Sequence, residues 1–304
     1  MRLNGPRTFT IPHVWRQTCG MVKVLGPFSL IDLLLLLAPV VVVPLGFRLA
    51  PLTSAHATVV LRVARYAQPV GALGAVVSFL VPIGSTSGLL AASWLVVCAI
   101  AAVAGLVELV ESRSLYPTHL LPAAALGVLL VGSAWLVVYR WGIDLGYSPT
   151  ITELTAVHFH YAGFAAVMMS ALVLNSFAAA SLRMRRIAAG AGLLVTFGTP
   201  MTATGVATGA ATLTVIGPVL LATGILTGSA LTAFVVAPTM RARARWLLTL
   251  SAAGVVIPMF LGVDYAASHV FPIPALDLRT MALVHGDLNA LVFALLGFVG
   301  WLLV

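Results

Sequence analysis

Acids, histidines and amides occur in three stretches of this sequence that are otherwise strongly apolar. Carboxyl and imidazole groups serve in proteins as general acids, general bases or metal ligands. Inside a bilayer an ionisable side chain costs roughly 2.5–3.5 kcal/mol at a helix centre, so such groups usually face the interior of a helix bundle. We therefore predict that the catalytic residues come from these stretches and are Glu153, His158, His160, Asp264, His285, Asp287 and Asn289.

The first stretch, residues 151–164, has a helical spacing that divides its polar residues between two faces. At 100° per residue, Glu153 and His160 lie seven positions apart and share a face with Phe164. His158 points well away from His160 for the same reason. We therefore expect Glu153 and His160 to face one site together.

The second stretch contains Asp264, Tyr265 and His269. The third stretch, residues 285–289, adds a second polar helix face. His285 and Asn289 are four positions apart and share that face, whereas Asp287 points elsewhere. When apolar runs are counted alternately across the membrane, this stretch, Glu153 and Asp264 fall toward the same membrane face. We expect one shared site there, in which either Glu153 or Asp264 is the acid. The alternative is that the acids lie at the headgroup boundary and cap helices.

Aromatic side chains accompany these polar residues. Aromatic rings present a negative π face that stabilises a nearby cation. Such rings would suit a carbocation formed when an acid protonates an alkene. The residues that we predict to contact the substrate are Trp141, Phe159, Tyr161, Phe164 and Tyr265.

The elements that must position these residues are membrane-spanning helices. Of the 304 residues, 61% are apolar and 8% are charged, whereas soluble domains carry about 25% charged residues. Runs of about 20 apolar residues are long enough to cross a bilayer as helix. The fold class is therefore an all-α polytopic transmembrane bundle of about eight or nine helices. The runs are residues 28–50, 59–81, 88–110, 119–139, 152–180, 187–208, 211–238, 246–265 and 281–303.

Charge divides the chain into two parts and indicates its orientation. Residues 1–27 are basic and lack an apolar core, so we predict a membrane-surface segment, followed by a single transmembrane domain at 28–304. The net charge of +8 comes from short basic clusters between apolar runs, as in a multi-pass protein of the cell membrane, and does not indicate nucleic-acid binding. The side expected to be cytoplasmic receives Arg48, Arg62, Arg65, Arg113, Arg183, Arg185, Arg186, Arg241, Arg243 and Arg245.

Two motifs carry a family resemblance. The segment Leu154–Phe164, LTAVHFHYAGF, together with His285–Ala290, HGDLNA, resembles the YndJ-like family of bacterial membrane proteins. A transporter label often accompanies that family. A looser similarity is to small membrane-bound terpene cyclases, which have several spans and buried carboxylates.

Three functions fit these residues. The first is an enzyme that starts terpene cyclisation by protonating a lipophilic isoprenoid. The catalytic acid must stay neutral until use, and apolar surroundings favour its neutral form. Such an enzyme needs no cofactor. No DDxxD motif for diphosphate ionisation occurs. The second is a haem or metal site that uses the HxH pair His158–His160 and His285. The third is a small-molecule or proton-coupled transporter. The expected partners are a lipophilic small molecule and membrane lipids.

Overall fold

The computed structural model describes residues 23–25 and 28–304. The predicted basic segment at residues 1–27 lies outside the described residues, apart from the strand β1 (Lys23–Leu25), which pairs with β2 (Phe28–Ser29) in a short antiparallel hairpin. From Leu30 onward the chain is helical, as the apolar runs predict.

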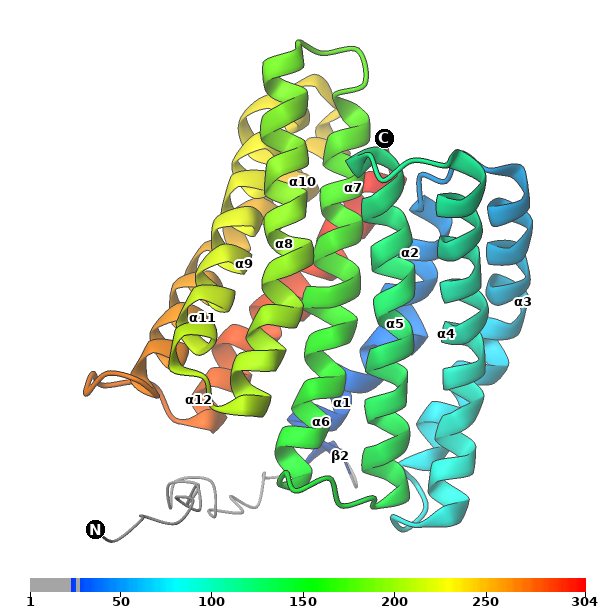
Figure 1. Cartoon of the computed structure of the whole chain (residues 1–304), viewed down its shortest axis with the longest axis vertical. Helices are drawn as coiled ribbons and strands as arrows, with labels where there is room; N and C mark the ends of the chain where they lie inside the picture. The colour runs from blue at the N-terminus through cyan, green and yellow to red at the C-terminus, as the bar shows by residue number, and fades with distance from the viewer. Residues whose placement is uncertain (1–22, 26–27) are drawn as a thin grey trace, which may run out of the picture.

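The described residues form nine long helices. These follow one another in alternating directions (Figure 1). Eight of the described helices are long and apolar enough to cross a membrane, so the prediction of an all-α transmembrane bundle is confirmed. The ninth, α3, is 24 residues long but carries two arginines. The helical segments are α1 (Leu30–Leu37), η2 (Ala38–Val42) and α2 (Val43–Leu49); α3 (Ala55–Ser78); α4 (Ser85–Ser112); α5 (Pro117–Trp141); α6 (Pro149–His158), η3 (Phe159–Ala165) and α7 (Ala166–Ser176); α8 (Leu182–Thr208); α9 (Ala211–Leu231), η4 (Thr232–Val236) and η5 (Ala237–Thr239); α10 (Ala242–Gly254) and α11 (Val256–Ser268); and α12 (Leu278–Met281), η6 (Ala282–Gly286), η7 (Leu288–Leu296) and α13 (Gly297–Leu302).

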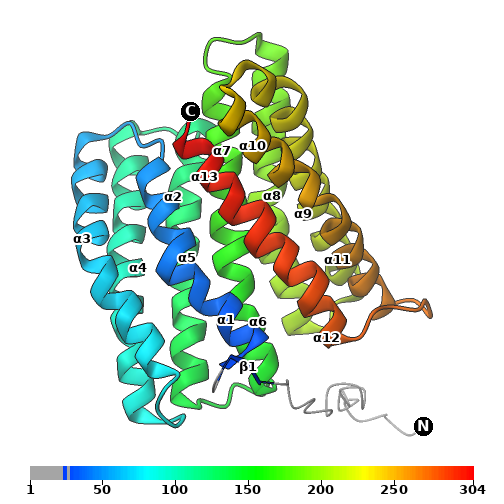
Figure 2. The ribbon, with the colours of Figure 1, turned by 180° about the vertical axis from the view of Figure 1, so that it is seen from behind.

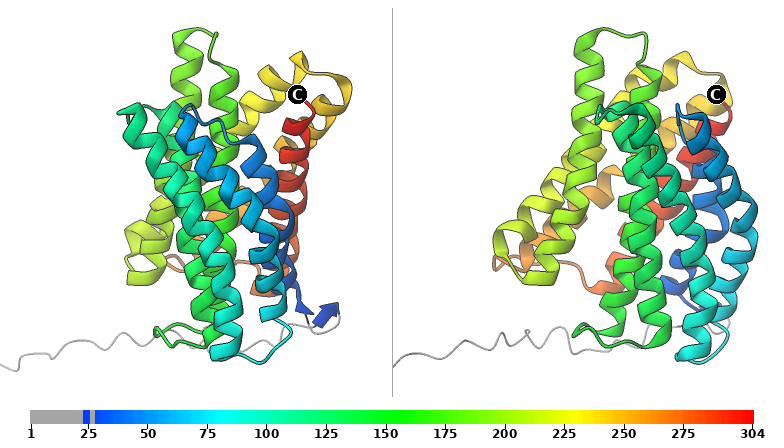
Figure 3. Two further views of the ribbon diagram at one scale, coloured as in Figure 1. Left: turned by 90° about the vertical axis from the view of Figure 1, so that its right-hand side faces the viewer. Right: turned by 45° about the vertical axis from the view of Figure 1, so that its right-hand side comes forward.

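The helix α6–η3–α7 lies at the centre of the bundle. Its apolar window is 83% buried, whereas the other spans are between 33% and 56% buried. Figures 1 and 3 show α3, α4 and α5 on one side of it and α8, α9, α10 and α11 on the other. In the view from behind, the helix α12–α13 crosses in front of it beside α1–α2 (Figure 2). The first polar motif of the sequence therefore lies on the most enclosed helix.

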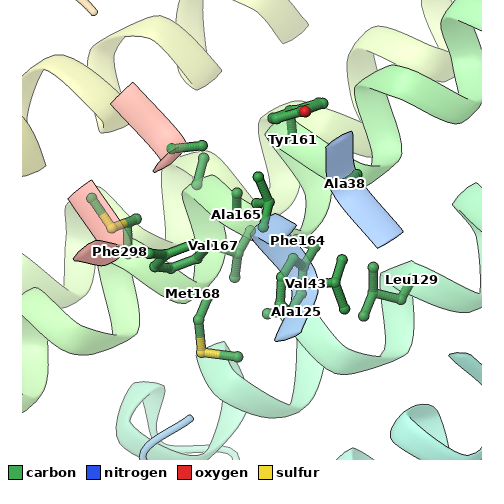
Figure 4. Packing of buried hydrophobic residues seen from close by; sticks show 14 of the residues in the cluster. Ala38, Val43, Ala125, Leu129, Tyr161, Phe164, Ala165, Val167, Met168 and Phe298 are labelled. Carbon is green, nitrogen blue, oxygen red and sulfur yellow. The ribbon is translucent and has the colours of Figure 1, made fainter. Parts of the chain in front are cut away.

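The aromatic core forms where this central helix meets the first and last spans. Phe164 is fully buried between Phe47 and Phe298, with ring centroids 6.1 and 6.2 Å away (Figure 4). Gly46 makes this approach possible, because a Cβ there would lie 2.5 Å from the Phe164 ring. The sequence predicts that Phe164 contacts a substrate, but in the structure it packs in the core.

π-helical turns interrupt several spans and leave backbone carbonyls to be satisfied by side chains. In η2 the Val43 amide donates to the Ala38 carbonyl, five residues back, which releases the Pro39 carbonyl. Gln68 Nε2 donates to that carbonyl at 2.7 Å. Near the start of η2, Tyr161 Oη donates to the Leu34 carbonyl at 2.8 Å. The turns η3 and η6–η7 coincide with the two sequence motifs, and π-turns often occur at functional sites.

The two ends of the bundle differ in charge. One end, which we call the basic end, carries the ten arginines that the sequence places on the expected cytoplasmic side. The opposite end, which we call the acidic end, includes the starts of α1, α6 and α12 (Figures 1 and 2). Its described residues include Arg140 and Arg279 and six acids, which are Asp32, Asp144, Glu153, Asp264, Asp277 and Asp287.

Candidate functional site

Glu153 lies at the acidic end, in the second turn of α6. The helix begins after Ser148, whose Oγ accepts the Ile151 amide at 3.3 Å, and Pro149 occupies its first turn. The Glu153 side chain is 5% exposed, and it interacts electrostatically with Asp32, Tyr139 and Arg140. Its Oε1 is buried and, among the described residues, has no hydrogen-bond partner. A buried carboxyl oxygen without a donor is uncommon in proteins and needs an explanation.

Asp32 brings a second carboxyl group to Glu153 from the first turn of α1. It forms a capping box with Ser29, in which Asp32 Oδ2 accepts the Ser29 amide at 2.7 Å and Ser29 Oγ accepts the Asp32 amide at 3.1 Å. Asp32 therefore caps α1. The same side chain also interacts with Glu153, so capping and participation in the cluster occur together.

Arg140 supplies the positive charge of this cluster. The sequence places it in a loop, but it is the second-last residue of α5 and is 5% exposed. Its Nε donates to Ser87 Oγ at 2.8 Å, and its Nη2 donates to the carbonyls of Ser78 and Val81 at 2.7 and 2.8 Å. The guanidinium also lies 4.6 Å from the centroid of the Phe79 ring. Arg140 therefore fixes the α3–α4 connection while it interacts with Asp32 and Glu153.

The charges of this cluster balance only with one added proton. Two ionised carboxyl groups, Asp32 and Glu153, and one guanidinium, Arg140, leave a net charge of −1. A low-dielectric environment penalises a net charge. The cluster is neutral when the two carboxyl groups hold one proton between them, and such a proton can be donated to a bound molecule.

His158 and His285 form a pair on another side of α6. Their ring centroids are 6.4 Å apart, with an angle of 32° between the rings. His158 Nδ1 lies 2.7 Å from the Leu154 carbonyl, and His285 Nδ1 lies 2.8 Å from the Pro258 carbonyl. Because a carbonyl only accepts, each Nδ1 must carry the proton, and each Nε2 of the neutral rings has a free lone pair. The pair thus offers two bases.

Residues on α11 and η7 shape the surroundings of His285. A Cβ at position 262 would lie 3.1 Å from His285 Cε1, so Gly262 leaves space for the ring. Asn289 Nδ2 donates to the His285 carbonyl at 2.8 Å. His285 and Asn289 thus lie on one helix face, and the Asn289 side chain stabilises the backbone of the π-helical turn by this hydrogen bond.

His160 faces α4 instead and has both ring nitrogens engaged. It is fully buried, its Nδ1 donates to the Ala156 carbonyl at 2.8 Å, and its Nε2 accepts from Trp94 Nε1 at 3.0 Å. The rings of Trp94 and His160 are stacked with centroids 6.3 Å apart. The two histidines of the HxH motif point to different helices, as the helical spacing predicts. His160 holds α6 against α4 and has no free lone pair for catalysis.

The acids of the last two spans lie apart from the Glu153 cluster. Asp264 is exposed, and Asp287 is partly exposed at the junction of η6 and η7. Among the described residues, neither interacts with Glu153. Asp277 caps α12, because its carboxyl accepts from the Thr280 amide at 3.0 Å and the Thr280 hydroxyl at 2.8 Å. These hydrogen bonds hold the pKa of Asp277 below its usual value.

The other predicted aromatic residues are also distributed over separate contacts. Tyr161 donates to the Leu34 carbonyl, and Tyr265 contacts His269 in an edge-to-face arrangement with ring centroids 4.9 Å apart. Trp141 covers Gly88 on α4, and Phe159 packs beside Gly132 on α5. The contacts of these rings, like those of Phe164, lie in different parts of the bundle.

A second polar cluster, which sequence reasoning missed, lies at the basic end. Glu108 is completely buried and accepts from the Thr53 amide at 3.0 Å, the Thr53 hydroxyl at 2.6 Å, the Ser54 amide at 2.9 Å and His119 Nδ1 at 2.9 Å. Glu111 beside it accepts from Ser54 Oγ and pairs with His56 at 2.6 Å. Glu108 and Glu111 are brought into one cluster by Thr53 and Ser54, which lie just before the start of α3.

Metal ligands do not converge in the part of the chain that the structure describes. No group of three or more histidine, cysteine, aspartate or glutamate side chains there has the geometry to hold a metal ion. The two free Nε2 atoms of His158 and His285 are the nearest approach to a ligand set, and structural or catalytic zinc sites use at least three protein ligands.

Comparison with known proteins gives one family. The model of the YndJ-like protein family matches residues 33–293, which include both motifs, Glu153 and Arg140. Neither a curated protein nor a solved structure matches the chain. Because the match covers most of the sequence, from within the first long helix to within the last, the chain belongs to the YndJ-like family.

Proposed function

We propose that this protein is an integral membrane enzyme that performs acid–base chemistry on a lipophilic substrate, with Glu153 as the acid. The observation that carries the proposal is the unpaired, buried Oε1 of Glu153 beside Asp32 and Arg140. An unpaired buried oxygen costs about 1–3 kcal/mol of stability. Such a cost is expected at a site where a bound molecule completes the hydrogen bonding.

The reaction that we propose is cyclisation of an isoprenoid started by proton transfer. The Glu153 carboxyl gives its proton to one carbon of an alkene, and the other alkene carbon becomes a cation. The electron pair of a second alkene then forms the ring bond and moves the cation along the chain. Loss of a proton from a carbon beside the final cation restores an alkene, so the product is an isomer of the substrate.

His158 and His285 suit the last step of this reaction. Their Nε2 lone pairs are free, and a neutral imidazole is a competent base. His158 is five residues beyond Glu153 on α6, a rise of about 7.5 Å along the helix. A substrate the length of a few isoprene units spans that separation. Asp32 and Arg140 keep the charge of the cluster balanced while the proton leaves and returns.

The orientation of the protein determines how the substrate reaches this site. If the arginine-rich end faces the cytoplasm of the cell, as the positive-inside rule indicates, Glu153 and the histidine pair lie in the outer half of the membrane. The His158 ring is exposed, in spite of its position on the central helix. A lipophilic molecule dissolved in that leaflet would meet His158 from the side, without crossing water.

The experiment uses the full chain, purified in detergent and incubated with farnesylated or geranylgeranylated acceptors. Mass spectrometry after chromatography would detect products of unchanged mass and altered retention. We expect Glu153→Gln to reduce turnover at least about 100-fold, because the amide has no transferable proton. The matched control is Asp264→Asn, since Asp264 is exposed and lies apart from the cluster; it should retain activity. Full turnover by Glu153→Gln would refute the proposal.

A further inference from the structure

A polar groove between α2 and α3 at the basic end lies far from the Glu153 cluster. It has a volume of about 300 Å³, and its polar lining is Arg48, Arg62, Arg65, Tyr66 and Gln68. Pro44 and Phe47 of the first span also line it. The groove therefore combines three positive charges with hydrogen-bonding groups and an apolar wall.

The arginines of this groove have no negative partner in the part of the chain that the structure describes. The ion pairs there join histidines to Glu108 and Glu111, and those two acids are the ones at the basic end. Both already accept hydrogen bonds from Thr53 or Ser54. Among the described residues, no further acidic side chain is left at this end to neutralise Arg48, Arg62 and Arg65.

Two of these arginines lie well beyond the start of α3. Arg62 and Arg65 follow the start of α3 by seven and ten residues, about 10 and 15 Å along the helix axis. At such depths a guanidinium reaches toward the headgroup layer along its own stem and pairs there with a phosphate. Arg48, near the end of α2, approaches the same groove from the other wall.

The outer face of α3 continues the groove as an apolar stripe. Exposed side chains follow one another at intervals of four and three residues, the spacing of a single helix face: Val59, Val63, Tyr66, Val70 and Leu73. The stripe runs from the level of the arginines toward the acidic end. It offers a path for an acyl chain directly below a site for a phosphate.

We propose that this groove binds the headgroup of an anionic phospholipid. The phosphate accepts hydrogen bonds from Arg48, Arg62 and Arg65, and the acyl chains lie along the outer stripe of α3. This site is separate from the proposed catalytic site and does not depend on it. It also accounts for the presence of two arginines in α3, the long helix that falls outside the eight apolar spans.

The test measures lipid retention by the delipidated full chain in a non-ionic detergent. Dioleoyl phosphatidylglycerol and dioleoyl phosphatidylcholine, which share acyl chains but differ in net charge, are titrated separately and bound lipid is counted by native mass spectrometry. We expect one phosphatidylglycerol to be held in preference to phosphatidylcholine. The variant Arg62→Gln/Arg65→Gln should weaken that binding about 30-fold, from roughly 1 kcal/mol for each basic residue near an anionic surface.

The matched control removes the same charge from the same end. Arg241 and Arg243 are exposed there and do not line the groove, so Arg241→Gln/Arg243→Gln should leave retention unchanged. Arg48→Gln changes the opposite wall and should weaken binding about fivefold. Equal retention of the two lipids, or equal losses in the two double variants, would overturn the proposal. So would displacement of phosphatidylglycerol by an excess of inorganic phosphate, which would identify a site for the free ion.

Discussion

Glu108 and Glu153 are buried toward opposite ends of the bundle, and their carboxyl groups are satisfied differently. Glu108 accepts four hydrogen bonds, from two amides, one hydroxyl and one imidazole. The Oε1 of Glu153 accepts none in the described part of the chain, and its neighbours include a second carboxyl group, Asp32. The two residues have the same chemistry and nearly the same burial, at 0% and 5% exposure.

This difference separates a structural acid from a candidate functional one. The donors of Glu108 include the amides of Thr53 and Ser54 at the start of α3, where a carboxylate also interacts favourably with the helix dipole. Glu108 thus joins α3, α4 and α5. At Glu153 a bond that would stabilise the fold is missing, and the free oxygen is available to a bound molecule. Three substitutions test whether this comparison holds.

The largest effect is expected when the counter-charge of the Glu153 cluster is removed. In Arg140→Leu, the carbonyls of Ser78 and Val81 and the hydroxyl of Ser87 lose their donor, and the buried Glu153 and the partly buried Asp32 lose their positive neighbour. Each acceptor that is left without its donor costs about 1–3 kcal/mol, so the three losses together cost at least about 3–5 kcal/mol. We expect a decrease of that size in the free energy of unfolding, measured by denaturant titration in mixed micelles.

The control for Arg140→Leu is Arg279→Leu, which removes an exposed arginine from the same end of the bundle. Surface substitutions of this kind change stability by about 0.5 kcal/mol or less. Equal losses of stability in the two variants would mean that Arg140 is an interfacial charge like Arg279. Arg140 would then not form a neutral cluster with Asp32 and Glu153.

Glu108→Gln is expected to have the second largest effect. An amide of the same shape replaces one oxygen by a donor, which then faces the amides of α3 or the donors Thr53 Oγ1 and His119. Charge-assisted hydrogen bonds contribute about 1.5–3 kcal/mol each, so we expect a loss of about 2–3 kcal/mol. Glu111→Gln is the comparison, because its side chain is 38% exposed and water can replace the lost contacts. A tolerated Glu108→Gln would remove the distinction between the two glutamates.

The fold was predictable from the sequence because hydropathy determines where a chain crosses a bilayer. The run predicted at residues 119–139 corresponds to α5 (Pro117–Trp141), and the run at 59–81 corresponds to α3 (Ala55–Ser78). The predicted run begins four residues later than α3 does. Ser54 caps the helix, and its polar first turn does not contribute to an apolar run. The π-helical turns were not predictable, since a carbonyl that they free is satisfied by a residue as distant as Gln68 is from Pro39.

The candidate site was predictable only in part. Glu153 and the opposite directions of His158 and His160 follow from helical spacing, which is local. The neighbours of Glu153 do not, because Asp32 and Arg140 come from other helices and each has a plausible local role, as a cap and as a basic residue at a helix end. The expected approach of Asp264 to Glu153 rested on their common membrane face. Two residues near the same membrane face lie at a similar depth in the membrane, but they can still lie on different sides of the helix bundle.

Glu153→Gln should have the smallest effect on stability, which would make the comparison sharpest. Among the described residues the Glu153 Oε1 has no hydrogen bond to lose, and an amide can keep the contacts of the side chain with Asp32 and Tyr139. A neutral amide also leaves Asp32 and Arg140 as one acid and one base of balanced charge. We expect the free energy of unfolding to change by about 0.5 kcal/mol or less, as at sites without special contacts. The same titration as for Glu108→Gln measures it. A loss above about 2 kcal/mol would show that Glu153, like Glu108, is held by bonds that the fold requires; an unchanged or increased stability means that the carboxyl group is kept for another reason than folding.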